Sequence, residues 1–393
     1  MADVLHLMRP GTLQLPALPP LALYVHLPWC LRKCPYCDFN SHESKAGLSP
    51  DTAAAYLAAL RADLEAALPL IWGRPVVSVF IGGGTPSLFN PEQIGELLSD
   101  IRARLPLEPA CEITLEANPG TFELERFAGF RQAGVTRLSV GVQSFDDAQL
   151  TVLGRVHSAG QAREALAEAA RAFDTFNLDL MYALPGQTLE ALERELDAAL
   201  SFKPPHLSIY HLTIEPNTVF ATRTPQGLPD ADLASDMLDL IHARTGAQWL
   251  QRYEVSAFAR EGHRCVHNTN YWQFGDYLGI GAGAHSKLSF PHRVLRQVRW
   301  REPAAFMAQA NKVSNEHEVA RKDLPFEFML NALRLKDGVT LTQFLERTGL
   351  PPSSIASGLQ TARERGLLEL DAARIQPTVR GFDFLSDLQQ LFL

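Results

Sequence analysis

Three cysteines near the N-terminus are the residues with the clearest potential for chemistry. Cys30, Cys34 and Cys37 follow the spacing C-x3-C-x2-C within the segment LPWCLRKCPYCDFN. Pro28 and Pro35 keep this segment from continuing as a helix, so the three thiols can turn toward one centre. Thiolates are the usual ligands of Fe-S clusters, and three of them on four irons leave one iron without a protein ligand. The motif therefore predicts a 4Fe-4S cluster whose open iron accepts an amino and a carboxylate group.

Two other interpretations of the cysteines remain open. One is a zinc site completed by His26 or His42, and the other is a set of ordinary core thiols. Zinc loops normally combine C-x2-C with a second pair of ligands, and no such pair is obvious in the sequence. Cys111 and Cys265 stand alone, and an isolated cysteine is commonly a small buried apolar residue, so we assign them no role.

Polar residues and glycines follow several apolar runs and form a second group of candidates. The glycines of GGGT, residues 82–85, let backbone amides approach a ligand closely, although such a run is also typical of a tight turn. Glu116 and Asp179 lie next to apolar runs, where a carboxylate either satisfies the backbone or accepts from ammonium and hydroxyl groups of a ligand. Gln143 and Arg155 allow the same two interpretations. Because all of these residues are expected at the ends of successive strands, they favour a binding site when taken together.

Short apolar runs alternate with helical segments over the first half of the chain and would position these residues. The runs span residues 21–27, 76–81, 112–117, 137–142, 177–183 and 206–214. Helices are predicted at residues 50–68 after Ser49 and at residues 91–105 after Asn90. Six strand-helix repeats indicate a parallel α/β sheet, either open and doubly wound or an incomplete barrel. We favour a partial (β/α)6 barrel, because its strand ends converge on one face.

The remainder of the chain predicts flanking elements and a second domain. A helix is expected near residues 230–245 and a strand near 252–258, followed by an aromatic, glycine-rich stretch to His285 that closes or flanks the barrel. Predicted helices at 325–334, 341–347 and 353–365, a hairpin in LLELDAARIQP and a last helix from Phe382 suggest a small winged-helix-like domain. The expected division is an N-terminal extension (1–20), a barrel with its flank (21–315) and a C-terminal domain (316–393).

Composition and charge exclude some classes of function. The formal net charge of -8 provides no basic face for a phosphate backbone, so nucleic acid is not an expected partner. No apolar segment resembles a signal peptide, and none reaches the roughly 18 residues that span a bilayer. We therefore expect a cytoplasmic protein that is not an integral membrane protein.

The strings LYVHLPWC, GGGTPS, LEANP, GVQSF, DLMYALPGQ and LSIYHL resemble the oxygen-independent coproporphyrinogen III oxidase group of radical SAM proteins. The resemblance runs from about residue 21 to the C-terminal domain and implies a barrel of the radical SAM type. It also implies that S-adenosylmethionine (SAM) binds at the open iron, where a reduced cluster passes an electron to the sulfonium. The SAM contacts that it implies are Tyr24, Tyr36, Gly83, Gly84, Thr85, Glu116, Gln143, Arg155, Asp179 and Thr213.

Within this group the chain departs from the decarboxylating enzymes. Those enzymes carry a further cysteine where Phe39 stands, and they have a longer segment before the cysteine motif. The continuation CDFNSH and the segment HNTNYW are instead similar to the HemW branch, whose members are haem chaperones. That similarity makes His267 a candidate haem ligand, with Tyr271 and Trp272 against the porphyrin. The alternative is a structural loop in which His267 and Asn268 satisfy backbone groups.

The sequence thus predicts a radical SAM haem chaperone that binds a 4Fe-4S cluster, SAM and haem as cargo. Its expected partners are haem-receiving respiratory membrane proteins and an electron donor for the cluster. The alternative function is an oxygen-independent coproporphyrinogen III dehydrogenase of porphyrin biosynthesis. No residue is assigned as catalytic.

Overall fold

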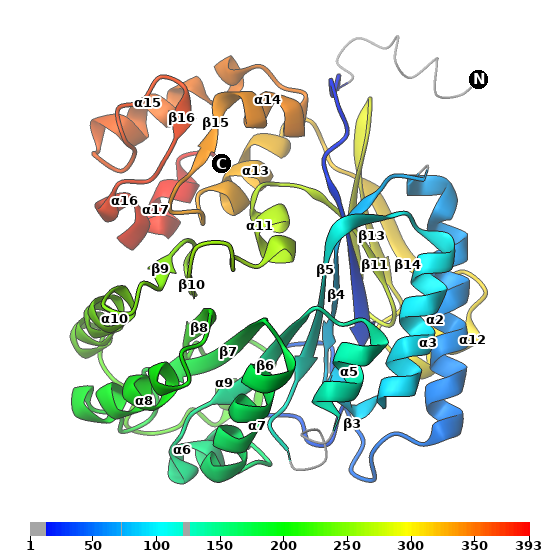
Figure 1. The fold of residues 1–393 in the computed structure, drawn as a ribbon. Coiled ribbons are helices and arrows are strands. Elements are labelled where there is room, and N and C mark those ends of the chain that lie inside the picture. Colours follow the sequence, from blue (N-terminus) through cyan, green and yellow to red (C-terminus); the bar gives the residue numbers. More distant parts are fainter. Residues whose placement is uncertain (1–12, 72, 121–125) are drawn as a thin grey trace.

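A single curved sheet forms the framework of the molecule (Figure 1). The computed structural model describes residues 13–71, 73–120 and 126–393, so most of the expected extension 1–20 lies outside the described residues. The sheet has 12 strands within these ranges. In spatial order they are β14 (Val313–Glu318), β13 (Arg293–Arg299), β12 (His285–Phe290), β11 (Asp276–Ile280), β1 (Leu21–Leu27), β4 (Val76–Gly83), β5 (Leu107–Ala117), β6 (Arg137–Gln143), β7 (Thr175–Tyr182), β8 (His206–His211), β10 (Ala257–Ala259) and β9 (Gln251–Arg252).

The middle of the sheet is parallel and its two edges are antiparallel. Strands β1, β4, β5, β6, β7 and β8 pair in parallel, each with its neighbour, and these are the six runs that the sequence predicts as strands. This confirms the α/β partial barrel. Strand β11 pairs in parallel with β1, and β12, β13 and β14 extend that edge antiparallel. Strands β10 and β9 extend the other edge, so the segments expected to flank the barrel enlarge its sheet.

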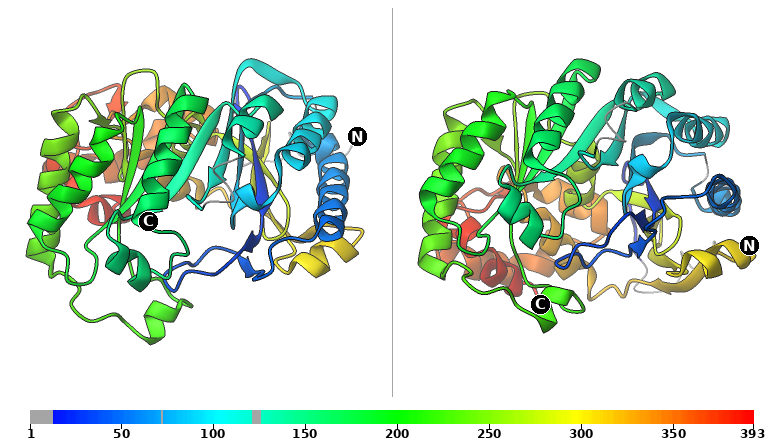
Figure 2. Two further views of the ribbon diagram at one scale, coloured as in Figure 1. Left: turned by 60° about the horizontal axis from the view of Figure 1, so that its bottom comes forward. Right: turned by 90° about the horizontal axis from the view of Figure 1, so that it is seen from below.

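Helices cover the convex side of this sheet (Figure 2). Helices α6 (Asp147–Val152) and α9 (Val219–Thr222) instead lie near the carboxyl ends of the strands, where the amide of Phe220 donates to the carbonyl of Pro35. The helices of the convex side are α2 (Pro50–Ile71), α3 (Pro91–Arg104), α5 (Phe127–Ala133), α7 (Ala159–Ala172), α8 (Leu189–Ser201) and α10 (Ala231–Gly246). Two begin at the caps that the sequence predicts. The Ser49 hydroxyl accepts from the amide of Thr52 at 3.1 Å, and Asn90 forms a capping box with Gln93. Their apolar faces and the strands enclose the main core.

Short elements occupy the two ends of the barrel. At the carboxyl ends of the strands lie β2 (Trp29–Cys30), β3 (His42–Glu43) and the 3-10 turn Pro86–Leu88. At the opposite end lies α11 (Val266–Trp272), whose His267 Nδ1 is 3.2 Å from Ser78 Oγ near the start of β4. Helix α12 (Pro303–Ala308) packs beside α2. No helix within the described residues combines the length and the apolar character that crossing a bilayer requires.

The C-terminal part of the chain has a core of its own. It contains α13 (Leu324–Ala332), β15 (Val339–Thr340), α14 (Leu341–Thr348), the 3-10 turn Pro352–Ile355, α15 (Ala356–Glu364), β16 (Arg374–Ile375), α16 (Val379–Asp383) and α17 (Leu385–Gln390). Phe328 and Phe344 are fully buried at the centre of this core. Leu13, Leu15 and Phe274 come to it from outside the unit.

Two local predictions were wrong in detail, and a third was confirmed. Residues 252–258 form the ends of β9 and β10 around a tight turn, because the Glu254 carboxylate accepts from the amide of Ser256 at 2.8 Å. The predicted hairpin LLELDAARIQP is present: Leu368 and Pro377 form an antiparallel bridge, the amide of Glu369 donates to the carbonyl of Gln376, and the second arm also pairs with β15. The last helix is two helices, since the backbone breaks at Phe384 between α16 and α17.

Candidate functional site

A cavity of about 400 Å³ opens at the carboxyl ends of the barrel strands. Twelve of the residues that the sequence analysis selected line it. They are Cys30, Cys34, Tyr36, Cys37, Gly83, Gly84, Thr85, Glu116, Gln143, Arg155, Asp179 and Thr213. A volume of this size suits a small-molecule ligand. The cysteine loop runs across this end of the barrel when the molecule is seen from below (Figure 2).

The cysteine loop is fastened to the barrel by hydrogen bonds on both of its sides. The carbonyl of Cys30 accepts from the amide of Ser44 at 2.8 Å. The Asn40 side-chain amide donates to the carbonyls of Ala282 at 3.0 Å and Arg301 at 2.9 Å. The Asn40 carbonyl lies 2.8 Å from His26 Nε2 and accepts from it. These contacts fix the backbone that presents the thiols to the cavity.

The three thiols and their surroundings suit an Fe-S cluster. Burial raises the pKa of the Cys30 and Cys37 thiols, whereas a bound metal holds a coordinating thiol in its deprotonated form. Arg155 Nη1 lies 3.6 Å from Cys34 Sγ and places a positive charge beside the position that a cluster would occupy. Among the described residues, no three His, Cys, Asp or Glu side chains are grouped so that they could hold a single metal ion. A cluster of several irons offers each thiolate its own iron, so this donor set fits it.

The glycines of the loop after β4 are needed for close packing. A Cβ on Gly83 would lie 2.5 Å from the His26 ring, and its φ of +115° is a conformation that favours glycine. A Cβ on Gly84 would lie 2.5 Å from the carbonyl oxygen of Trp29. The glycine run thus allows the loop to pack against the cysteine segment. The tight-turn interpretation is correct for the backbone, and the same residues line the cavity.

Two carboxylates face the cavity from the barrel interior. Glu116 Oε2 accepts from the amide of Gly83 at 3.1 Å, and burial followed by the charge of Asp179 raises the pKa of Glu116 to about 7. Burial raises the pKa of Asp179 to about 6, against the hydrogen bonds that Asn177 and Ser139 donate to it. Asp179 lies within β7, not at its end as the sequence suggested. Both acids can accept from a cationic or hydroxyl-bearing ligand.

Arg155 and Gln143 complete this part of the wall. Arg155 Nη2 donates to the carbonyl of Gly141 at 2.8 Å, while its buried Nε has no hydrogen-bond partner in the described part of the chain. Gln143 ends β6 with a φ of +71°, a strained value for a residue with a side chain. Asn118 and Tyr210 also line the cavity and were not predicted from the sequence. Asn118 follows the end of β5 within LEANP, and that position was the available signal.

The other two candidates do not line the cavity. Tyr24 lies beneath it with its hydroxyl 2.9 Å from His26 Nδ1. His267 is buried on α11 at the opposite end of the barrel, next to the rings of Tyr24 and Phe80. Burial lowers the pKa of His267 to about 3, so the imidazole is neutral. The HNTNYW segment is therefore a packed helix, and the structure does not bring His267 to the cavity.

Two family models match the chain. The radical SAM superfamily matches residues 24–199, and the HemN C-terminal domain matches residues 319–384. The first match covers the barrel strands β1 to β7 with their helices, and the second covers most of the C-terminal unit.

The chain is similar to several known proteins over almost its whole length. The chain is 46% identical to the heme chaperone HemW of Escherichia coli (strain K12), over 96% of this chain and 99% of that protein. It is 37% identical to the heme chaperone HemW of Mycobacterium tuberculosis (strain ATCC 25618 / H37Rv), over 95% and 96%. It is 36% identical to the mitochondrial radical S-adenosyl methionine domain-containing protein 1 of Bos taurus, over 93% and 86%.

One solved structure has the same fold over most of its length. It is coproporphyrinogen III oxidase (HemN) from Escherichia coli, described as a radical SAM enzyme. The TM-score is 0.81 at 25% sequence identity, with 95% of this chain and 90% of that chain covered.

Proposed function

The chain belongs to the HemW haem chaperone family within the radical SAM superfamily, and on this basis we propose that it binds and delivers haem. In this proposal Cys30, Cys34 and Cys37 hold a 4Fe-4S cluster and the adjoining cavity binds SAM. Haem is the cargo, respiratory membrane enzymes receive it, and the protein works in the cytoplasm. The observation that carries the proposal is that one cavity gathers the three thiols, the glycine loop and two half-buried acids.

Different residues of the cavity would bind different parts of SAM. When bound, the cluster supplies an iron for the amino and carboxylate groups and an electron from an external donor protein. The backbone of Gly83, Gly84 and Thr85 forms the wall next to the methionine end. Glu116 and Asp179 accept from ammonium or ribose hydroxyl groups, and their burial keeps water from competing for those bonds.

The remaining residues of the proposed SAM site either provide charge and polar groups or hold the cysteine loop in place. Arg155 lines the cavity and places a fixed positive charge beside Cys34, where it can attract an anionic group of a ligand. Gln143 and Thr213 provide further polar groups at the wall, and Tyr36 provides an aromatic edge. Tyr24 contributes indirectly, because its hydroxyl holds His26, which in turn holds the cysteine loop.

A second function has specific support from the fold. The similarity to HemN extends through both the barrel and the C-terminal unit, so a coproporphyrinogen III dehydrogenase is the competing proposal. Against it, Phe39 is 60% exposed at the mouth of the cavity, where the resembling enzymes carry a further cysteine. This difference favours the chaperone.

One anaerobic experiment separates the two functions. The protein is reconstituted with iron and sulfide, reduced, and incubated with SAM and either coproporphyrinogen III or haem. We expect stoichiometric haem uptake, seen by absorption spectroscopy, with no protoporphyrinogen formed. Formation of protoporphyrinogen over several turnovers would overturn the chaperone proposal. Cys34→Ala should lose the cluster absorption and iron, whereas Cys111→Ala, away from the cavity, should retain both.

His267 is our proposed axial haem ligand, and its burial sets a condition on that role. Since its ring packs on Phe80 and bonds Ser78, α11 has to shift before the imidazole can reach a haem iron. We expect His267→Ala to weaken haem binding about tenfold or more and to change the absorption spectrum. His317→Ala, on the exposed strand β14, is the matched control. An unchanged affinity and spectrum in His267→Ala would remove this residue from the site.

A further inference from the structure

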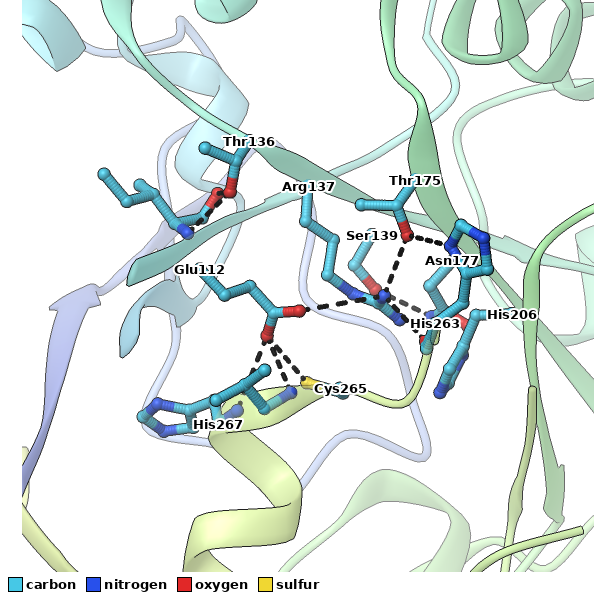
Figure 3. A network of polar contacts seen from close by, with 12 residues as sticks. Glu112, Thr136, Arg137, Ser139, Thr175, Asn177, His206, His263, Cys265 and His267 are labelled. Carbon is cyan, nitrogen blue, oxygen red and sulfur yellow. Dashed lines mark hydrogen bonds and ion pairs between the residues drawn. The ribbon is translucent and has the colours of Figure 1, made fainter. Parts of the chain in front are cut away.

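A chain of hydrogen-bonded side chains crosses the barrel interior from the cavity to α11. Figure 3 shows its middle members, Asn177 and His206, together with Cys265 at the start of α11. At the cavity end, Asn177 Nδ2 donates to Asp179 Oδ1 at 2.7 Å. Asn177 Oδ1 is 2.7 Å from His206 Nδ1, and His206 Nε2 is 2.8 Å from the Tyr253 hydroxyl. The Tyr253 oxygen accepts from the amide of Cys265 at 3.3 Å, and Cys265 is the N-cap of α11. Four successive hydrogen bonds therefore join Asp179 to the start of this helix.

The donors along this chain all point the same way. Burial lowers the pKa of His206 well below its usual value, so its ring is neutral and carries one proton. With that proton on Nδ1, the ring donates to Asn177 and accepts the Tyr253 hydroxyl proton on Nε2. The Cys265 amide, the Tyr253 hydroxyl, the His206 ring and the Asn177 amide then each donate toward Asp179. Hydrogen bonds aligned in one direction in a low-dielectric interior polarise one another.

The helix end of the chain is held by an acid on β5. Glu112 Oε1 accepts from the amide of Val266 at 2.9 Å and lies 3.5 Å from Cys265 Sγ. The buried guanidinium of Arg137 lies 4.0 Å from Glu112 Oε2 and donates to the carbonyl of His263 at 3.2 Å. Figure 3 shows these groups together beneath β5 and β6. The first turn of α11 is thus bound to the same polar interior that supports Asp179.

We propose that Asn177, His206 and Tyr253 are positioning residues that orient the Asp179 carboxylate and couple ligand binding in the cavity to the N-terminus of α11. The inference rests on the proposed function, because it takes SAM as the ligand of Asp179. It adds a physical connection between the SAM cavity and the helix that carries the proposed haem ligand. A ligand group that bonds Asp179 changes the acceptor at one end of the chain, and Cys265 and its helix are at the other.

Few charged or titratable groups surround Asp179, so a change in its pKa can be traced to the loss of a single hydrogen bond. Glu116 faces it from β5, Arg137 from β6, and His206 and Tyr210 from β8. His206 and Tyr210 stay neutral, since burial lowers the pKa of the first and raises that of the second. The Asn177 hydrogen bond lowers the pKa of Asp179, so removing it raises that pKa further. Less of the carboxylate is then ionised at pH 7.

The first test removes the donor next to Asp179. SAM affinity is measured by equilibrium binding to the reconstituted, anaerobic protein from pH 5.5 to 8.5, for the wild type and Asn177→Leu. We expect affinity at pH 7 to fall about tenfold and the midpoint of its pH dependence to rise by about one unit. His206→Asn keeps a donor near the Nδ1 position, so it should retain affinity within about threefold of the wild type. A structural defect alone would lower affinity without moving the midpoint.

The second test breaks the chain away from the ligand and uses a conservative change. Hydrogen exchange of the α11 amides is followed by mass spectrometry with and without SAM. In the wild type we expect SAM to slow this exchange about fivefold or more. In Tyr253→Phe the protection should disappear while SAM affinity falls less than about threefold. Tyr182→Phe, a buried tyrosine packed in the main core, should behave as the wild type.

The outcomes separate this inference from the function on which it rests. A wild-type protein that holds its cluster but does not bind SAM overturns the proposed function, and the inference with it. Normal SAM binding by the wild type, with an unmoved pH midpoint in Asn177→Leu, overturns the positioning role alone. Equal protection of α11 in the wild type and Tyr253→Phe overturns the coupling alone.

Discussion

At the scale of single residues, the surroundings of Glu116 and Asp179 disfavour their charged forms, which lowers the stability of the ligand-free protein. Glu116 and Asp179 are both half-buried, loss of solvation raises the pKa of each, and the charge of Asp179 raises that of Glu116 further. A core built only for stability would replace one of them, because a buried acid needs compensation. The compensation here is partial: Gly83 donates to one carboxylate, and Asn177 to the other. A cationic ligand would supply the remainder, so the pair is better explained by binding than by folding.

This cost predicts that Glu116→Gln stabilises the protein in the absence of ligand. The pKa of Glu116 is raised from its usual 4.5 to about 7, so the folded state binds a proton that the unfolded state releases between these values. Stability from this group is therefore lost as pH rises from about 4.5 to 7. Glutamine has no such proton. At pH 8 we expect the free energy of unfolding to rise by about 1–2 kcal/mol in the variant.

Denaturant unfolding of the ligand-free protein at pH 5 and pH 8 measures this effect. The gain should be smaller at pH 5, where the wild-type carboxyl is mostly protonated. The same variant should bind SAM more weakly, which reverses the order of the two proteins when SAM is present. A variant that is less stable than the wild type at both pH values would contradict the explanation.

The sequence could predict the residues that touch the cavity better than those that support them. Glu116 lies near the end of one apolar run and Thr85 shortly after another, and these positions alone bring them to one face of a parallel barrel. His206 and Tyr253 are 47 positions apart, and their hydrogen bond depends on how β10 folds back on β8. No local pattern carries that information. The supporting network therefore required the structure.

At the scale of elements, the cysteine loop depends on contacts from distant segments. Asn40 joins it to the β11–β12 connection through the carbonyl of Ala282, and to the segment after β13 through that of Arg301. His26 at the end of β1 joins it to the parallel sheet. The loop itself contains little regular structure beyond β2 and β3. Its shape is set by these anchors.

We expect Asn40→Ala to weaken retention of the cluster. The change removes two hydrogen bonds to backbone carbonyls, which should destabilise the loop by about 1–3 kcal/mol. Iron should be released several-fold faster to a chelator under anaerobic conditions, while far-UV circular dichroism stays that of the wild type. Asn315→Ala, on the exposed strand β14, is the control. Equal rates of iron release in Asn40→Ala and the wild type would show that the cluster ligands hold the loop unaided.

Elements with strong local patterns were predicted, and those fixed by distant partners were not. The six central strands have apolar runs bounded by turns, and Asn90 with Gln93 marks the start of α3. Strand β11 reads as part of a glycine-rich stretch, yet it pairs in parallel with β1 some 250 positions earlier, from Leu21 to Val25. Its Asp276 is buried against Lys287 and Arg74, a network that joins three separate segments. Such pairing is a property of the whole sheet.

At the scale of the whole molecule, the C-terminal unit and the barrel share a boundary instead of a flexible linker. Strand β14 continues the sheet up to Glu318, where the HemN C-terminal match begins. The amide of Lys336 donates to the carbonyl of Tyr253 at 3.0 Å, and the guanidinium of Arg334 lies over the ring of Trp272 at the end of α11. The helix proposed to carry the haem ligand is therefore enclosed between the two units.

This shared boundary predicts that the molecule unfolds as one cooperative unit. Phe328 is fully buried in the second core, with its ring 5.6 Å from Phe274 of the barrel and 5.2 Å from Phe344. Phe328→Ala should lower the free energy of unfolding by about 3–5 kcal/mol. Leu330→Ala, which changes a half-exposed side chain on the same helix, should cost less than about 1 kcal/mol.

The number of transitions decides whether the boundary is rigid. Denaturant unfolding is followed by tryptophan fluorescence and far-UV circular dichroism, since Trp272 lies at the boundary and most helices lie in the barrel. Because Leu13, Leu15 and Phe274 join the second core from outside, its loss exposes apolar surface of the barrel as well. We therefore expect coincident single transitions in the wild type and in Phe328→Ala. An early fluorescence transition that leaves the circular dichroism of the barrel intact would mean that the C-terminal unit opens on its own, and α11 would then be free to move without unfolding the SAM site.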